Sequence, residues 1–210
     1  MNWEVENIDS TKEIRDLSER LKVSNITASL LVSRGIKTFE GAKTFFRPSL
    51  DDLHDPFLMK DMDNAVIRIL DAVKKEEKIL IYGDYDVDGT SSVALVCKFL
   101  RTNTKNQIGT YIPDRYDEGY GISFKSIDYA LDNDFTLIIA LDCGIKAIDK
   151  VDYANKNNID YIICDHHKPG ETIPAAVAVL NPLREDCNYP FKFLCGCGIG
   201  FKLIQALSAR

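Results

Sequence analysis

The sequence predicts an α/β protein in which a parallel sheet follows a helical leader. After Lys78, short apolar runs alternate with segments whose apolar residues recur at helical spacing. The runs are hydrophobic at consecutive positions, as in strands that are covered on both faces. Strand–helix–strand repetition is typical of parallel strands joined by crossover helices. We therefore expect a Rossmann-like sheet domain over residues 78–210, and a helical leader over residues 1–77 that packs on it.

The leader contains four segments with helical signals, at residues 10–21, 24–36, 38–50 and 62–78. Ser10 and Glu13 predict a capping box at the start of the first helix. Gly35 predicts the end of the second helix, and Pro48 the end of the third. In the fourth segment the apolar residues fall on one stripe, and basic residues near its end suit the helix dipole.

Five apolar runs predict the strands, at residues 79–82, 107–112, 136–141, 160–164 and 176–180. Helical segments at 91–101, 124–133 and 145–157 separate the first four runs. In open parallel sheets, ligands bind beyond the carboxyl ends of the strands. The residues that follow each run are therefore the first place to search for a functional site.

Composition limits the class of protein. Apolar residues make up 45% and charged residues 28% of the 210 residues, which is ordinary for a soluble globular protein. No apolar stretch approaches the roughly 20 residues that span a bilayer, and the acidic, polar N-terminus is no secretory signal. We expect a cytoplasmic protein with no membrane contact, whose 6 cysteines are reduced thiols. The net charge of −6 argues against a broad basic surface but allows a local site.

Acidic residues and histidines follow three of the expected strands. A single acid at such a place is commonly only a helix N-cap. Three alternating acids within five residues repel one another unless a cation lies among them, and in an extended segment they point to one side. The residues concerned are Asp84, Asp86 and Asp88 in "GDYDVDGTSS", Asp142 in "LDCG", and Asp165, His166 and His167 in "CDHH".

These ligand types suit a particular metal chemistry. Carboxylates combined with imidazole, and no committed thiolate, favour Mn²⁺ or Mg²⁺, with Mn²⁺ preferred where histidine joins. The acids are too many for one ion. Two ions about 3.5–4 Å apart would share a carboxylate and serve in-line attack on phosphorus. We expect His166 to be a metal ligand and His167 to touch the substrate.

The same residues carry a family resemblance. "DYDVDGTSS", "LDCG" and "DHHKPG" resemble the first three motifs of the DHH phosphoesterase family. "YIPDRYDEGYGIS", "NPLREDCNYPFKFLCGCGIGFKL" and parts of the leader are similar to its RecJ branch. Membership of that branch implies 5′→3′ hydrolysis of single-stranded DNA in DNA repair and recombination. It also implies single-strand-binding protein and a helicase as partners.

The resemblance implies a role for each matching residue. Asp84, Asp86 and Asp142 would hold one ion. Asp88, Asp142 and His166 would hold the other, so that Asp142 bridges the pair. Asp165 would position the histidines from behind, and His167 would contact the phosphate that is attacked by a metal-activated water. Asp84 departs from many relatives, which have histidine there, so the metal preference stays open.

The family's fourth motif is a further aspartate, which would follow the helix that this sequence begins near residue 198. We therefore expect residues 1–210 to be an N-terminal fragment of a longer protein. Such a fragment would hold the metals incompletely and would be inactive on its own.

The segment "DRYDEGYG" supplies candidate substrate contacts. Arg115 is suited to a phosphate, Tyr116 or Tyr120 to stacking on a base, and Gly119 to a close approach of backbone. A solvent loop after the second strand explains the same residues equally well, and Lys168 is read as a surface lysine.

Other functions also fit parts of the sequence. "DVDGT" alone matches HAD-type phosphatases, with Asp86 as nucleophile and Asp88 as its acid/base partner, but that scheme has no use for Asp84 or the histidines. Shorter DHH relatives cleave nano-RNA, cyclic dinucleotides or pyrophosphate. A non-enzymatic alternative is a DHH fold that serves only as an assembly module, as happens when its acids are lost. The "CGCG" segment with Cys187 is a weak zinc pattern, better explained by a tight helix entry. His54 is expected in a turn.

Overall fold

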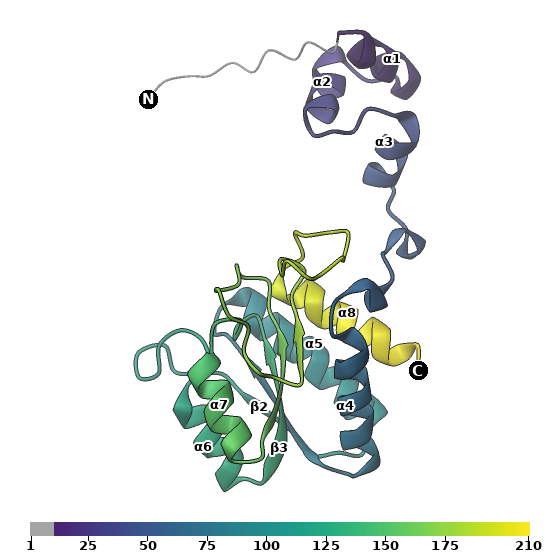
Figure 1. Cartoon of the computed structure of the whole chain (residues 1–210). Helices are drawn as coiled ribbons and strands as arrows, with labels where there is room; N and C mark the ends of the chain where they lie inside the picture. Colours follow the sequence, from purple (N-terminus) through teal and green to yellow (C-terminus); the bar gives the residue numbers. More distant parts are fainter. Residues whose placement is uncertain (1–10) are drawn as a thin grey trace. The chain divides into compact units, whose positions relative to one another are not determined.

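A computed structural model describes residues 11–210 of the chain. The chain divides into two compact units, Met1–Leu53 and His54–Arg210 (Figure 1). This division places helix α4 (Met62–Lys74), which was expected in the leader, in the same unit as the sheet. Among residues 11–210, no helix is both long enough and apolar enough to cross a membrane.

The first unit is a small group of helices around its own core. It contains α1 (Thr11–Leu21), α2 (Asn25–Ser33), α3 (Phe39–Phe46) and a short 3₁₀ helix, η1 (Leu50–Asp52). The hydroxyls of Ser24 and Thr38 cap α2 and α3. Five apolar side chains are buried together: Leu17, Ala28, Leu31, Val32 and Ala42. Ser10, the expected cap of the first helix, lies outside the described residues.

The second unit is built on a five-stranded parallel sheet of order β2-β1-β3-β4-β5. The strands are β1 (Lys78–Gly83), β2 (Ile108–Tyr111), β3 (Phe135–Leu141), β4 (Asp160–Cys164) and β5 (Ala178–Leu180). The fold class predicted from the sequence is therefore confirmed. The order reverses beside β1, because β2 lies on one side of it and β3 on the other.

Helices cover both faces of the sheet, which explains the consecutive apolar residues in its strands. Ile79 and Ile81 belong to one buried cluster, and Leu80 and Tyr82 belong to the other, as the two-residue period of a strand requires. The first cluster includes residues of α4, α5 (Val87–Asn103) and α8 (Gly196–Ser208), with η2 (Pro56–Leu58) against α8. The second includes residues of α6 (Phe124–Asp132) and α7 (Ile148–Lys156).

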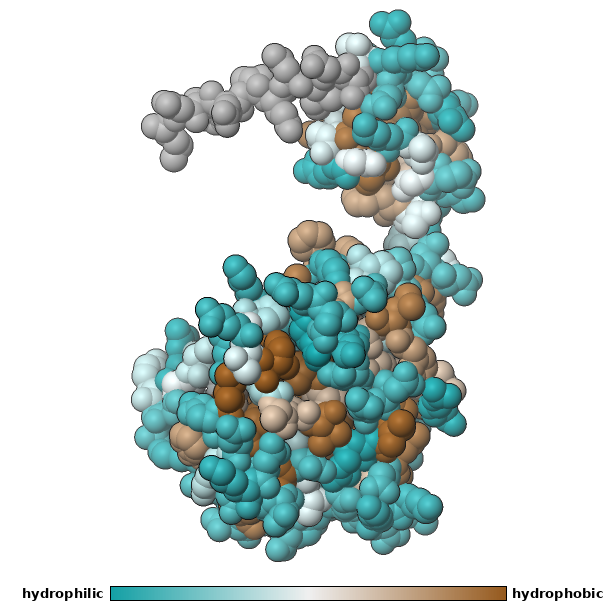
Figure 2. All heavy atoms as spheres, viewed as in Figure 1, coloured by the Kyte–Doolittle hydropathy of each residue, from teal (hydrophilic) through white to brown (hydrophobic). Residues whose placement is uncertain are grey.

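All five strands point the same way, so their carboxyl ends meet at one edge of the sheet. The loops that follow β1, β3 and β4 carry the acids and histidines singled out above. That edge, at the reversal of strand order, is where α/β sheets bind ligands. On the face drawn in Figure 2, hydrophilic residues dominate, with patches of hydrophobic residues between them.

Candidate metal centre

The three acids after β1 do not all lie on an extended segment. Asp84 follows the strand and is buried, and Asp86 is the N-cap of α5, its carboxylate accepting a hydrogen bond from the Gly89 amide at 2.9 Å. Asp88 is already in the first turn of the helix. The expected one-sided alternation is therefore corrected, because the cap at Asp86 turns the chain into a helix.

Gly89 explains how this turn stays close to the strand. A Cβ atom on Gly89 would lie 2.4 Å from the carbonyl oxygen of Asp84, far inside van der Waals contact. Only glycine lets the start of α5 approach the end of β1 so closely. Burial raises the pKa of Asp84, although a hydrogen bond from the Tyr85 amide partly offsets this.

Asp88 is held by the start of a helix that is remote in sequence. Its two carboxylate oxygens accept hydrogen bonds from the amides of Gly196 and Cys197, at 2.7 and 2.8 Å. Burial raises the pKa of Asp88, but these two hydrogen bonds, together with a contact to Cys195 and the nearby His166, more than offset it, so the net shift is downward. Asp88 Oδ2 lies 3.7 Å from Nε2 of His166.

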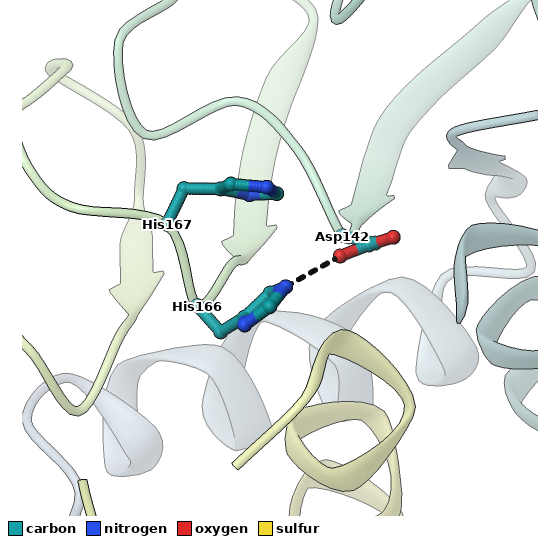
Figure 3. Close-up of side chains that lie close together, drawn as sticks. All are labelled: Asp142, His166 and His167. Carbon is teal, nitrogen blue, oxygen red and sulfur yellow. Dashed lines mark ion pairs between the residues drawn. The ribbon is translucent and has the colours of Figure 1, made fainter. Parts of the chain in front are cut away.

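Asp142 occupies the centre of the site. It follows β3, its side chain is only 2% exposed, and its backbone adopts a left-handed φ of 63°. Its Oδ1 lies 3.1 Å from Nε2 of His166 (Figure 3). That oxygen nevertheless accepts no hydrogen bond from residues 11–210. A buried carboxylate oxygen without a hydrogen-bond donor costs free energy, and a cation bound to it would remove that cost.

The charge state of Asp142 supports the same reading. Burial raises its pKa to about 8, and the nearby carboxylates of Asp88 and Asp86 add to the effect. The carboxyl group therefore keeps its proton near neutral pH when no cation is present. A divalent cation would replace that proton and supply the missing positive charge.

The histidine pair is oriented by Asp165. One oxygen of this buried carboxylate lies 2.7 Å from Nδ1 of His167 and accepts a hydrogen bond from its amide at 3.1 Å. The other oxygen accepts from the Ile145 amide at 2.8 Å. Burial raises the pKa of Asp165, but these hydrogen bonds more than offset it and lower the pKa overall. The hydrogen bond to Asp165 in turn raises the pKa of His167.

The two imidazole rings lie side by side. Their centroids are 4.5 Å apart, and Figure 3 shows both rings extending from consecutive residues towards Asp142. Nε2 of His167 lies 3.1 Å from the hydroxyl of Tyr120. The loop after β2 therefore reaches the third motif, which the sequence alone did not indicate.

Within residues 11–210, two groups of side chains have the geometry to hold a metal ion. Ligand atoms of Asp84, Asp86 and Asp142 lie within 4.8 Å of one another, and so do those of Asp142, His166 and His167. Asp142 belongs to both groups. The structure thus assembles residues from three separate loops, with Asp88 beside His166 but bound to the start of α8.

The loop over residues 112–123 borders this centre. The Arg115 guanidinium lies 5.3 Å from the ring centroid of Tyr85, next to Asp84 in sequence, and Tyr116 is 97% exposed. Gly119 and Gly121 both adopt positive φ. Glu118 organises the loop from within, because it accepts hydrogen bonds from the Tyr111 hydroxyl, the Asp114 amide and the Ser123 hydroxyl.

The remaining expectations concern cysteine and the third histidine. All six cysteines are free thiols, and among residues 11–210 none joins a group with metal-binding geometry. Cys195 is the N-cap of α8, where a tight helix entry was expected. His54 precedes η2, and its carbonyl accepts a hydrogen bond from the buried ammonium of Lys202 at 2.7 Å.

Comparison with known proteins gives consistent matches. The model of the DHH family, N-terminal domain, matches residues 78–210. The single-stranded-DNA-specific exonuclease RecJ of Bacillus subtilis (strain 168) is 42% identical over 207 residues, which are 99% of this chain and 26% of that protein. RecJ of Escherichia coli (strain K12) is 37% identical over 149 residues, which are 71% of this chain and 26% of that protein.

Solved structures agree with these matches. RecJ from Thermus thermophilus in complex with Mn²⁺ has a TM-score of 0.78 and 25% identity, covering 100% of this chain and 29% of that one. An exonuclease RecJ bound to manganese has a TM-score of 0.66 and 29% identity, covering 72% of this chain and 38% of that one. The chain spans about a quarter of the length of the curated relatives it matches.

Proposed function

The chain belongs to the DHH family, and we propose that it forms the metal-binding part of an exonuclease that removes nucleotides from single-stranded DNA in the 5′→3′ direction. The observation that carries this proposal is Asp142, which is buried, has an oxygen without a hydrogen-bond donor, and belongs to both groups of potential ligands. A carboxylate in that position is suited to bridge two Mn²⁺ or Mg²⁺ ions. The relatives whose structures contain manganese support the choice of metal.

The residues of the centre divide into two proposed ligand sets. Asp84, Asp86 and Asp142 would hold one ion, and Asp88, Asp142 and His166 the other. When bound, two such ions supply Lewis acidity, which activates water as a nucleophile and neutralises charge on the phosphate. The α8 amides that bind Asp88 use one lone pair on each of its oxygens, which leaves others for a metal.

His167 is proposed to act on the substrate. Its Nδ1 is held by Asp165, and its raised pKa favours the imidazolium, which suits contact with a scissile phosphate. Tyr120 fixes the other side of the ring. Arg115, Tyr116 and Gly119 belong to the same loop as Tyr120, and we propose that this loop receives the phosphate and base next to the cleaved bond.

We propose a role for each part of the chain, and partners and a location for the whole protein. Residues 78–210 carry the metal centre, and residues 1–77 precede it, with α4 at their end belonging to the same compact unit as the sheet. Single-strand-binding protein and a helicase are proposed partners of the whole protein, because such an exonuclease needs single strands to be made and kept unpaired. The six free thiols support the cytoplasm as the proposed location.

One set of measurements tests the function. Isothermal titration of the chain with Mn²⁺ should show binding that Asp142→Ala abolishes. The whole protein should release mononucleotides from 5′-labelled single-stranded DNA in Mn²⁺, and Asp142→Ala should lower the rate by several orders of magnitude. Faster cleavage of nano-RNA or a cyclic dinucleotide than of DNA would move the protein to another branch of the family. A covalent aspartyl-phosphate trapped by beryllium fluoride would contradict the two-metal proposal.

A further inference from the structure

The loop over residues 181–195, between β5 and α8, reverses the usual placement of apolar and charged side chains. At its end, Phe191 and Phe193 are exposed, Phe193 by 84%, whereas Lys192 between them is half-buried. Leu194 is half-buried against the core. An alternation that turns two phenylalanines outwards and a lysine inwards leaves apolar area in water, which is unfavourable unless a partner covers it.

Lys192 explains how the phenylalanines are held outwards. Its ammonium donates hydrogen bonds to the carbonyl oxygens of Pro182 and Cys187, at 2.9 and 2.7 Å. The Lys192 side chain therefore points into the loop and binds its earlier residues. The side chains on either side of it, Phe191 and Phe193, point outwards. The Phe191 and Phe193 rings lie edge to face, with centroids 5.9 Å apart.

Both ends of this loop are bound to residues of the metal centre. At its start, the Asn181 side-chain amide donates to the carbonyl oxygen of His167 at 2.9 Å. Just beyond its end, the Gly196 and Cys197 amides hold Asp88. Within it, the buried Arg184 binds the Asp61 carboxylate at 2.6 Å and Asp186 at 2.8 Å. The aromatic pair is thus carried on an ordered support that is fixed to the centre.

We propose that Phe191 and Phe193 form a stacking surface for the bases of a single strand whose phosphate lies at the metal centre. The inference rests on the proposed function and adds the residues that hold the bases. Aromatic rings accept any base, because every base has a flat face, so the contact would tolerate all sequences. In a duplex the base faces are already stacked on one another, so this surface would favour unpaired strands.

The position of the surface supports a nucleic acid as its occupant. The Tyr116 loop follows β2, which is one edge strand of the sheet, and the 181–195 loop follows β5, which is the other. The ligand groups lie at the ends of the strands between them. A strand bound at the metal centre would therefore have exposed aromatic residues beside it in two loops, Tyr116 in one and Phe193, three residues before Gly196, in the other.

A double-mutant cycle between protein and DNA tests this proposal. Binding of the whole protein to single-stranded oligonucleotides is measured by fluorescence anisotropy with Ca²⁺ in place of Mn²⁺, under conditions in which no cleavage is detected, so that a divalent ion still holds the phosphate at the centre. Each oligonucleotide carries one abasic site, placed at successive positions from the 5′ end. Phe193→Ala should weaken binding of the intact strand about 5- to 150-fold, the range for loss of one stacked base. Phe193→Ala should have little effect on the affinity for one of the abasic oligonucleotides, the one that lacks the base stacked on Phe193, because that contact is already lost.

The control is a second exposed aromatic pair. Phe45 and Phe46 of α3 have ring centroids 5.1 Å apart and are both more than half exposed. Phe45→Ala should leave binding of every oligonucleotide unchanged. Phe193→Trp should retain or tighten binding, which separates stacking from a general disturbance of the loop.

Two results would overturn the proposal. One is that, at every position of the abasic site, the change in binding free energy caused by Phe193→Ala simply adds to the change caused by the abasic site. The other is that Phe193→Ala leaves DNA binding intact but lowers the melting temperature of the whole protein, since another part of the protein would then cover the ring. Mn²⁺ binding and hydrolysis of the single strand are measured in parallel. If they persist while the cycle shows no coupling, the stacking surface fails and the proposed function stands.

Discussion

The Oδ1 atom of Asp142 lies 3.1 Å from Nε2 of His166 yet accepts no hydrogen bond from residues 11–210. The two residues come from the ends of neighbouring strands, β3 and β4, which pair in parallel. Their approach therefore follows from the sheet itself. It places a buried carboxylate next to an imidazole, two ligand types that together suit a divalent cation.

Asp142 should make the metal-free chain less stable as the pH rises. A carboxyl whose pKa is raised by folding keeps its proton in the folded chain after the unfolded chain has lost it. From about pH 4 to the folded pKa of about 8, the free energy of unfolding should therefore fall because of this group. Asp142→Asn has no such proton. The free energy of unfolding of this variant, relative to that of the unsubstituted chain, should therefore rise by at most about 1.4 kcal/mol per pH unit.

Urea denaturation in EDTA at pH 5, 6.5 and 8 measures this difference. Working with the difference between the two chains cancels the contributions of other titrating groups. Stability curves that stay parallel across this range would show that Asp142 is ionised without a metal. The orphaned oxygen would then need another explanation.

His167 should be dispensable for metal binding and needed for turnover. In the whole protein, His167→Ala should leave the Mn²⁺ dissociation constant within about threefold and lower kcat by about 100-fold or more, as for loss of a group that acts on the reacting phosphate. His166→Ala should lose Mn²⁺ binding. Tyr120→Phe, which removes the hydroxyl beside His167, should have a smaller effect on kcat than His167→Ala. Equal loss of metal in both histidine variants would make His167 a ligand.

Gly196 should be required for the contact between α8 and the centre. A Cβ atom there would lie 2.6 Å from Oδ1 of Asp142, so the start of α8 would have to move and its amide would leave Asp88. Gly196→Ala should lower Mn²⁺ affinity about tenfold or more and destabilise the chain by about 1–3 kcal/mol. Gly198→Ala is the matched control, because its Cβ would meet only side chains of the preceding segment, those of Leu194 at 3.2 Å and Cys195 at 3.8 Å. Isothermal titration and thermal denaturation of both variants decide the outcome, and equal effects would remove any special role of Gly196.

Residues 1–210 alone should bind single-stranded DNA weakly or undetectably at physiological salt, and Mn²⁺ should improve the binding. Non-specific affinity scales with the number of phosphates neutralised by lysine and arginine, and the chain carries a net charge of −6. Arg115 and the metal centre together neutralise only a few phosphates. Fluorescence anisotropy with a labelled oligonucleotide tests this. Tight, metal-independent binding would reveal a basic groove on this part of the protein.

The strands and the edge that carries the site were predictable from the sequence. Strands covered on both faces need apolar side chains at consecutive positions, and this pattern marked β1, β3, β4 and β5. The edge strand β2 has a partly exposed face and a more polar sequence, and its short apolar run still indicated it. Because parallel strands end at a common edge, the residues after them had to meet there. Asp84, Asp142 and His166 could therefore be assigned to one place from the sequence alone.

Only the tertiary structure decided how those residues are held. Asp88 is fixed by amides 108 and 109 positions later in the chain, and His167 by Tyr120 and Asn181 from two different loops. The Asp142 side chain is covered by the start of α8, because Gly196 lies so close that a Cβ there would be 2.6 Å from Oδ1. Hydrogen bonds and close contacts between distant segments leave no periodic pattern in the sequence, because each depends on where the packed elements bring single atoms.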